Sequence, residues 1–193
     1  MITLIRSTIA GACVRISRLF KPVPQPSSPK LVSRQQSREE PDFYKRGGFH
    51  PVSLGDTFDS NRYTILRKLG YGQYSTVWLR YVAMKILRAD CYGGPHDIFE
   101  RAILSRILEV SRNSSHEGRK FLLKLIEQFN HRGPNGDHVC LVSDVLGHHL
   151  GFQAAKYKYG RLPVRAVKEI VRQLLTGLDF LHTECGVIHT GIS

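Results

Sequence analysis

The feature that most constrains this chain is a pair of glycines between two predicted strands, with a lysine on the strand that follows. The segment is Leu69-Gly70-Tyr71-Gly72-Gln73-Tyr74-Ser75-Thr76-Val77, and Lys85 comes eight residues after Val77, at the end of Val82-Ala83-Met84-Lys85. Because glycine has no Cβ, its backbone N–H group can approach a phosphate closely. A G-x-G turn is common, and an exposed strand lysine is the simpler interpretation of Lys85 taken alone. The two in this order instead predict a site for nucleotide phosphates.

A buried or phosphate-facing lysine needs a carboxylate partner, and the next predicted helix offers Glu100. Gly93-Gly94-Pro95 would open this helix, with the proline in its first turn. Four apolar residues recur with helical spacing and predict one packing face: Phe99, Ile103, Ile107 and Val110. The alternative is that Glu100 is solvated and pairs with nearby arginines on its own helix.

The remaining pattern predicts further strands and a second long helix. Strands are expected over 63–69, 76–87, 122–129 and 138–146, with turns over 70–75 and 133–136. A long helix is expected from Pro163 to about Glu184, with Gly186 as a stop signal beyond it. Its predicted buried stripe is Val164, Val167, Val171, Leu174, Leu178 and Leu181.

The first 40 residues differ from the rest of the chain in composition and periodicity. Apolar residues with helical spacing and an early absence of acids make residues 1–20 resemble a mitochondrial presequence, although an untargeted disordered tail fits equally well. Four prolines between Lys21 and Pro29 then favour an extended linker. The folded region is therefore expected to begin near Glu40, and mitochondrial targeting depends on the presequence interpretation.

Charge and cysteine content exclude several classes of protein. The net charge is +12, of which the first 40 residues contribute +5. This charge would attract acidic partners, but no basic helix, aromatic ladder or zinc spacing predicts a specific nucleic-acid site. The cysteines at 13, 91, 140 and 185 form no C-x-x-C pair, so they are expected to be buried and neither disulfide-bonded nor metal-bound. No apolar run is long enough for a membrane span.

Together these motifs resemble a protein kinase, and more specifically a serine/threonine kinase of the SR-protein kinase type. The resemblance covers about residues 42–193. Beyond the glycine loop and the lysine strand, it rests on three runs and the chain's end: residues 49–56, Ser75-Thr76-Val77-Trp78-Leu79, Val145-Leu146-Gly147-His148-His149-Leu150 and Val187-Ile188-His189-Thr190.

The resemblance implies an α+β fold of two lobes with ATP held between them. Gly70, Gly72 and Ser75 would cover the phosphates, and Leu69, Tyr71 and Gln73 would belong to the same nucleotide site. Val77 and Ala83 would sandwich adenine, and Lys85 would hold phosphates while paired with Glu100. Asp144 and Leu146 would offer backbone groups to the adenine edge, with Ser143 beside the pocket behind it. Cytoplasmic or nuclear location, and Arg/Ser-rich protein substrates, follow from the same resemblance.

Two departures from the family pattern concern catalysis. The family's catalytic loop reads His-Thr-Asp-Ile-Lys, whereas this chain reads His189-Thr190-Gly191-Ile192-Ser193. Glycine supplies no base and serine no cation at those two places. No catalytic residue is therefore expected to be intact. The sequence also ends at Ser193, before the family's magnesium-binding residues, so no metal ligand is expected within it.

A third departure lies between the second and third strands. Residues 76–88 contain no Gly, Pro, Asn or Asp, and only Leu79-Arg80-Tyr81 separates the two motifs. Either the turn passes through Arg80 or the strands are shortened; lost sequence would explain both this gap and the early stop.

These observations divide the chain into a terminal segment (1–40), a β-rich lobe with hinge (41–146) and the first part of a helical lobe (147–193). The leading interpretation is a kinase-family chain that retains ATP-binding elements but has lost phosphoryl transfer. The alternatives are a pseudokinase-type module that binds a partner, and a fragment that does not fold stably.

Overall fold

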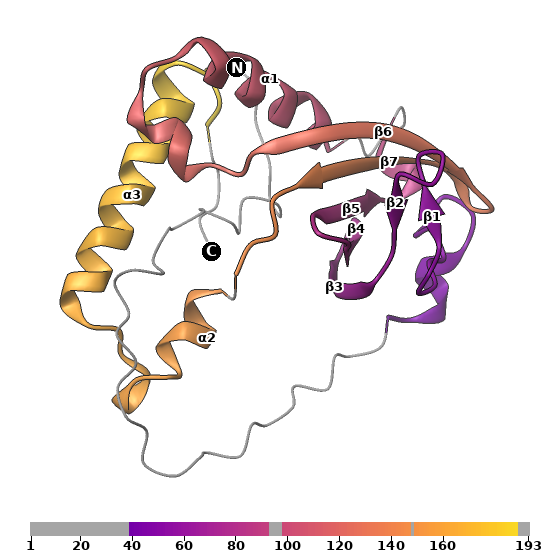
Figure 1. Ribbon diagram of the computed structural model, residues 1–193, viewed down its shortest axis with the longest axis horizontal. Helices are drawn as coiled ribbons and strands as arrows, with labels where there is room; N and C mark the ends of the chain where they lie inside the picture. The colour runs from indigo at the N-terminus through magenta and orange to yellow at the C-terminus, as the bar shows by residue number, and fades with distance from the viewer. Residues whose placement is uncertain (1–38, 93–97, 148, 189–193) are drawn as a thin grey trace.

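A five-stranded antiparallel sheet lies on the right in Figure 1, with the helices to its left. The computed structural model describes residues 39–92, 98–147 and 149–188. The strand order is β3-β4-β5-β7-β6. The strands are β3 (Arg67–Gly72), β4 (Ser75–Leu79), β5 (Ala83–Leu87), β6 (Leu125–Gly133) and β7 (Gly136–Ser143). A separate two-stranded ribbon, β1 (Thr57–Phe58) and β2 (Tyr63–Thr64), precedes the sheet.

Helix α1 (Glu100–Asn113) lies beside the sheet, and helix α3 (Val164–Thr183) lies farther from it (Figure 1). Helix α1 packs against the sheet, and α3 lies on the far side of α1. The short elements are α2 (Leu150–Ala154) and the 3₁₀ turns η1 (Pro41–Tyr44), η2 (Ala89–Cys91), η3 (Glu117–Phe121) and η4 (Lys158–Gly160). This arrangement confirms the predicted α+β, kinase-like fold. None of the helices in these ranges is both long and apolar enough to span a membrane.

The two faces of the sheet bury different clusters. One face carries Trp78, Met84, Ile86, Cys140 and Val142, which pack with Phe58, Tyr63 and Ile65. The other face carries Leu87, Val139 and Leu141, which pack with Leu104 of α1 and with Leu125. Because strand residues alternate between faces, this second set fixes the side on which α1 must lie.

The sequence placed several element boundaries wrongly. The predicted strand over 63–69 is two strands, and β3 runs through both glycines to Gly72, so the turn is only Gln73-Tyr74. Gly70 pairs with Val77 and Gly72 with Ser75, because a glycine backbone pairs in a sheet as any other residue does. Likewise the β6–β7 turn is only Pro134-Asn135, while Gly133 and Gly136 pair with each other.

The expected connection problem between β4 and β5 is solved by a three-residue loop, Arg80-Tyr81-Val82. The Arg80 N–H donates to the Val82 carbonyl at 3.0 Å. Leu79, the last residue of β4, then pairs directly with Ala83, the first residue of β5. The turn therefore does pass through Arg80.

Two predictions about helix α1 were wrong at its start. The helix begins at Glu100, five residues after Pro95, which lies outside the described ranges. Phe99 precedes it in a left-handed conformation and is half exposed, so it does not share the buried face. Ile103 and Ile107 are buried as predicted.

The predicted buried stripe of α3 was largely wrong. Val164, Val167 and Val171 are exposed, Leu174 and Leu178 are half-buried, and only Leu181 is fully buried. The face that packs inward is rotated by about one residue: Ala166, Ile170, Gln173, Gly177 and Phe180. Gly186, with a φ of +66°, does follow the end of the helix as predicted.

Close contact with η3 selects this face of α3. A Cβ at Gly118 would lie 2.2 Å from the Thr176 carbonyl oxygen, so only glycine lets η3 approach so closely. A Cβ at Gly177, opposite, would make only an ordinary contact, 3.6 Å from Phe121 Cβ. Gly118 thus allows a backbone contact that apolar periodicity could not indicate.

The cysteines in the described ranges are buried free thiols, as predicted: Cys91, Cys140 and Cys185. Burial raises the pKa of Cys91 and of Cys140 to about 12. Cys13 and the whole predicted presequence lie outside the described residues.

Three histidine rings meet where the N-terminal segment crosses the β6–β7 hairpin, a cluster that the sequence did not predict. The His50 ring centroid lies 4.6 Å from that of His131 and 5.0 Å from that of His138. His138 is fully buried and its Nδ1–H donates to the Leu87 carbonyl at 2.9 Å. Burial lowers the pKa of all three, that of His50 to about 4, with the neighbouring imidazoles adding to the effect on His50.

We therefore expect the protein to lose stability as the pH falls. Because the folded pKa of His50 is below its unfolded value, its contribution is complete above about pH 6.5 and is lost as the pH falls towards about 4. The free energy of unfolding should drop by roughly 1–2 kcal/mol between about pH 7 and pH 5. Urea unfolding at the two pH values measures it. In His50→Gln the drop should be smaller, since an amide does not titrate. An equal drop in this variant would show that His50 is not the source of the pH dependence.

Candidate functional site

Three predicted site residues, Gly70, Val77 and Lys85, lie on the α1-facing side of the sheet because of the strand register. Gly70 pairs with Val77, Val77 with Lys85, and Lys85 with Leu141. Directly paired residues share a face, so these positions form one row across four strands. Leu79, Ala83 and Ser143 form the adjacent row on the same face.

Lys85 and Glu100 form the ion pair that the sequence predicted. Lys85 Nζ lies 2.8 Å from Glu100 Oε1 and 2.9 Å from Oε2. The Lys85 side chain is 17% exposed and that of Glu100 only 2%. The alternative, a solvated Glu100 paired on its own helix, is therefore wrong. Burial lowers the pKa of Lys85, while the Glu100 carboxylate acts in the opposite direction.

Packing of α1 brings this pair together. Leu104, one turn after Glu100, packs in the cluster formed by Leu87 and Leu141. Those two leucines flank Lys85 on the sheet, one along β5 and one across on β7. The helix therefore presents Glu100 to the strand that carries Lys85.

The strand that carries the two glycines, β3, has open space beside the row of residues that contains Lys85. A Cβ built at Gly70 or at Gly72 would meet no atom within 4 Å. Tyr71 and Gln73 are exposed, and Leu69 forms the β-bulge between Lys68 and Gly70. Ser75 and Ala83 are buried, whereas Val77 is half-buried. The backbone of β3 is accessible where a phosphate-binding role requires it.

The predicted hinge residues follow β7 directly. Ser143, which pairs with Ala83, ends the strand, and its hydroxyl donates to the Asp144 carbonyl at 3.3 Å. Asp144 is exposed and Leu146 half-buried. Gly191 and Ser193, which stand at the predicted catalytic positions, lie outside the described residues.

The sequence interpretation missed Leu141 as the cross-strand neighbour of Lys85. Alternation along β7 could have placed Leu141 and Val139 on one face, but no sequence signal gives the register between strands so far apart. Among the described residues, no group of three or more His, Cys, Asp or Glu side chains is arranged to hold a metal ion.

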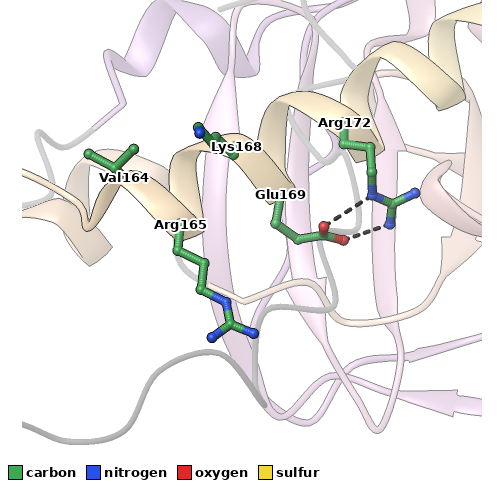
Figure 2. Close-up of a pocket in the computed structure, with 5 residues that line it drawn as sticks. All are labelled: Val164, Arg165, Lys168, Glu169 and Arg172. Carbon is green, nitrogen blue, oxygen red and sulfur yellow. Dashed lines mark hydrogen bonds and ion pairs between the residues drawn. The ribbon is translucent and has the colours of Figure 1, made fainter.

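A hollow of about 530 Å³ elsewhere in the molecule is separate from this site. It is lined by Val164, Arg165, Lys168, Glu169 and Arg172, all from α3 (Figure 2). The Glu169 carboxylate bonds to the Arg172 guanidinium, at 2.6 and 3.0 Å. None of the predicted nucleotide residues lines it.

Comparison with known proteins identifies the family of the chain. It is 42% identical over 170 residues to "Protein kinase dsk1" of Schizosaccharomyces pombe, covering 84% of this chain and 31% of that protein. It is 42% identical over 181 residues to human "SRSF protein kinase 3", covering 90% of this chain and 31% of that protein. It is 40% identical over 166 residues to "Serine/threonine-protein kinase SKY1" of Saccharomyces cerevisiae, covering 82% of this chain and 22% of that protein.

The chain thus spans about a third or less of the length of these curated relatives. No protein-family model matches it. The relatives nevertheless match along most of the chain, over 82–90% of its length. By this homology the chain belongs to the SR-protein kinase family of the protein kinase superfamily.

Proposed function

We propose that this chain is the nucleotide-binding part of a serine/threonine protein kinase of the SR-protein kinase type. The observation that carries the proposal is the bidentate Lys85–Glu100 pair beside the open glycine strand. An ammonium held in place by a buried carboxylate is preorganised for phosphate oxygens and need not be ordered when the nucleotide binds.

The residues present fit ATP. Backbone groups of Gly70 and Gly72 and the Lys85 ammonium would hold its phosphates, and the half-buried Val77 with the buried Ala83 offers an apolar surface for adenine. Asp144 and Leu146 would meet the adenine edge through their backbone. ATP would supply the phosphoryl group, and Arg/Ser-rich proteins are the proposed substrates.

We further propose that phosphoryl transfer by this chain is severely impaired. Gly191 replaces the aspartate that accepts the substrate proton in the family, and Ser193 replaces the lysine that stabilises the transferring phosphate. The chain would then bind nucleotide without efficient chemistry.

A second candidate, a pseudokinase-type module that binds a partner protein, is favoured by one observation. Val164, Val167, Val171 and Leu175 are exposed along one side of α3. Apolar residues exposed in a row favour contact with another protein segment.

Lys85→Met is expected to weaken binding of a fluorescent ATP analogue by at least about tenfold, the equivalent of losing one charged hydrogen bond. Titration of the purified chain measures it, with circular dichroism to confirm that each variant is folded. Lys168→Met on α3 removes the same charge away from the site and should leave the affinity unchanged. Lys85→Arg, which keeps a cation beside Glu100, should retain more of the affinity than Lys85→Met. Equal affinity for wild type and folded Lys85→Met would refute the assignment.

A further inference from the structure

A second hollow, of about 340 Å³, lies between the C-terminal half of α1 and the segment that joins η3 to β6. Its floor is apolar. Leu108, Leu122 and Leu123 are half-buried there, and the buried Ile107 and Leu125 lie beneath them. We call this hollow the α1–η3 groove. It shares no residue with the proposed nucleotide site.

The charged residues that line the α1–η3 groove are all basic. They are Arg112, Arg119, Lys120 and Lys124, and all four are exposed. Lys120 pairs with the Glu117 carboxylate, 3.5 Å from Lys120 Nζ, with both side chains more than 60% exposed. Such an exposed pair contributes little. Within the described ranges, Arg112 and Lys124 take part in no ion pair.

The walls of the α1–η3 groove are fixed relative to each other. Arg119 Nη1 donates to the Ser111 carbonyl at 2.9 Å, which ties η3 to the last turn of α1. On its other side η3 is held against α3 by the close packing of Gly118. The groove is therefore formed before any ligand binds, and ligand binding need not order it.

The end of a helix would normally repel an anion, because its free carbonyls carry partial negative charge. At α1, however, the Ser111 carbonyl accepts from Arg119 and the Val110 carbonyl accepts from the Ser114 N–H. Arg112 adds a cation in the same turn. The local field at the rim is therefore positive.

We propose that the α1–η3 groove binds an acidic, amphipathic peptide segment of a partner protein. Two or three bulky apolar side chains would enter the floor, and carboxylates on either side would face the four cations. Charge complementarity selects this class of ligand, and the apolar floor separates it from ligands that bind through charge alone. Single-stranded nucleic acid, which would use the cations but not the leucines, is the competing occupant.

The test uses the full chain and a short fluorescein-labelled peptide in which leucine and phenylalanine alternate with glutamates, followed by fluorescence anisotropy. We expect saturable binding that weakens as salt rises. Arg112→Glu with Lys124→Glu should weaken it by about tenfold or more. The matched control is Arg165→Glu with Lys168→Glu, which changes the same number of exposed charges on α3 and should have little effect.

A second arm tests the apolar floor. Leu123→Asn, and separately a peptide whose leucines and phenylalanines are replaced by serine, should each weaken binding several-fold while the salt dependence persists. Equal loss in the two charge-reversal variants would overturn the proposal and indicate general attraction to a basic chain. Unchanged binding of the serine peptide, equal competition by a single-stranded oligonucleotide, or no binding at all would overturn it too. No nucleotide is present, so failure here leaves the ATP proposal standing.

Discussion

Replacing Gly191 with Asp and Ser193 with Lys is expected to raise phosphoryl transfer by about 10²–10⁴-fold. The comparison requires a chimera in which this chain is followed by the part of the fission yeast relative that lies beyond the matched region. A positioned carboxylate orients and deprotonates the attacking hydroxyl, and a lysine offsets charge on the transferring phosphate. The unaltered chimera has neither group at these positions.

The assay follows radiolabelled phosphate from ATP into an Arg-Ser repeat peptide. Each single replacement should recover only part of the rate, because residues of one catalytic unit do not act additively. Gly191→Asn with Ser193→Met is the matched control, since it restores size without a base or a cation, and should remain slow. Both versions should also be made with a longer β4–β5 turn after Arg80. Equally fast transfer by the unaltered chimera would show that another residue acts as the base.

The second large effect concerns the folded state itself. Lys85→Met is expected to lower the free energy of unfolding by about 3 kcal/mol or more. The Glu100 side chain is only 2% exposed, so the substitution removes a salt bridge from a buried carboxylate. Urea unfolding followed by tryptophan fluorescence suits the measurement, because the only tryptophan, Trp78, is buried on β4.

The double variant Lys85→Met with Glu100→Met distinguishes the ion pair from simple loss of packing. Removing both charges takes away the buried carboxylate together with the ammonium, so the double variant should be more stable than Lys85→Met alone. Lys168→Met again serves as the control and should change stability by no more than about 0.5 kcal/mol. If the two single losses simply add in the double variant, the pair does not behave as a coupled buried unit.

Much of the site was predictable because its parts are close in sequence. Gly70, Val77 and Lys85 occupy consecutive strands joined by tight turns, and the predicted partner Glu100 follows on the next helix. Short connections leave few ways to arrange such elements. The domain boundaries, the role of each residue towards ATP and the identity of a partner stay predictions, because neither the fold nor the relatives test them.

The errors arose where more than one arrangement satisfies the same pattern. Because glycine is common in turns in general, the predicted turns over 70–75 and 133–136 were too long. The two observed hairpin turns are only two residues long. Helix α3 carries apolar residues on two sides, and the prediction selected the side that is exposed. The histidine cluster and the α1–η3 groove join residues far apart in the chain, with no local signal for either.

By itself, the sequence determined the α+β class, the order of the elements and the pairing of Lys85 with Glu100, since periodicity and short connections act locally. Only the tertiary structure decided which face of α3 is buried, which residues share a row with Lys85, and where the basic rim closes around an apolar floor. The reason is physical. Register and helix rotation depend on contacts between segments far apart in the chain, and at η3 the missing Cβ of Gly118 permits the close contact with α3.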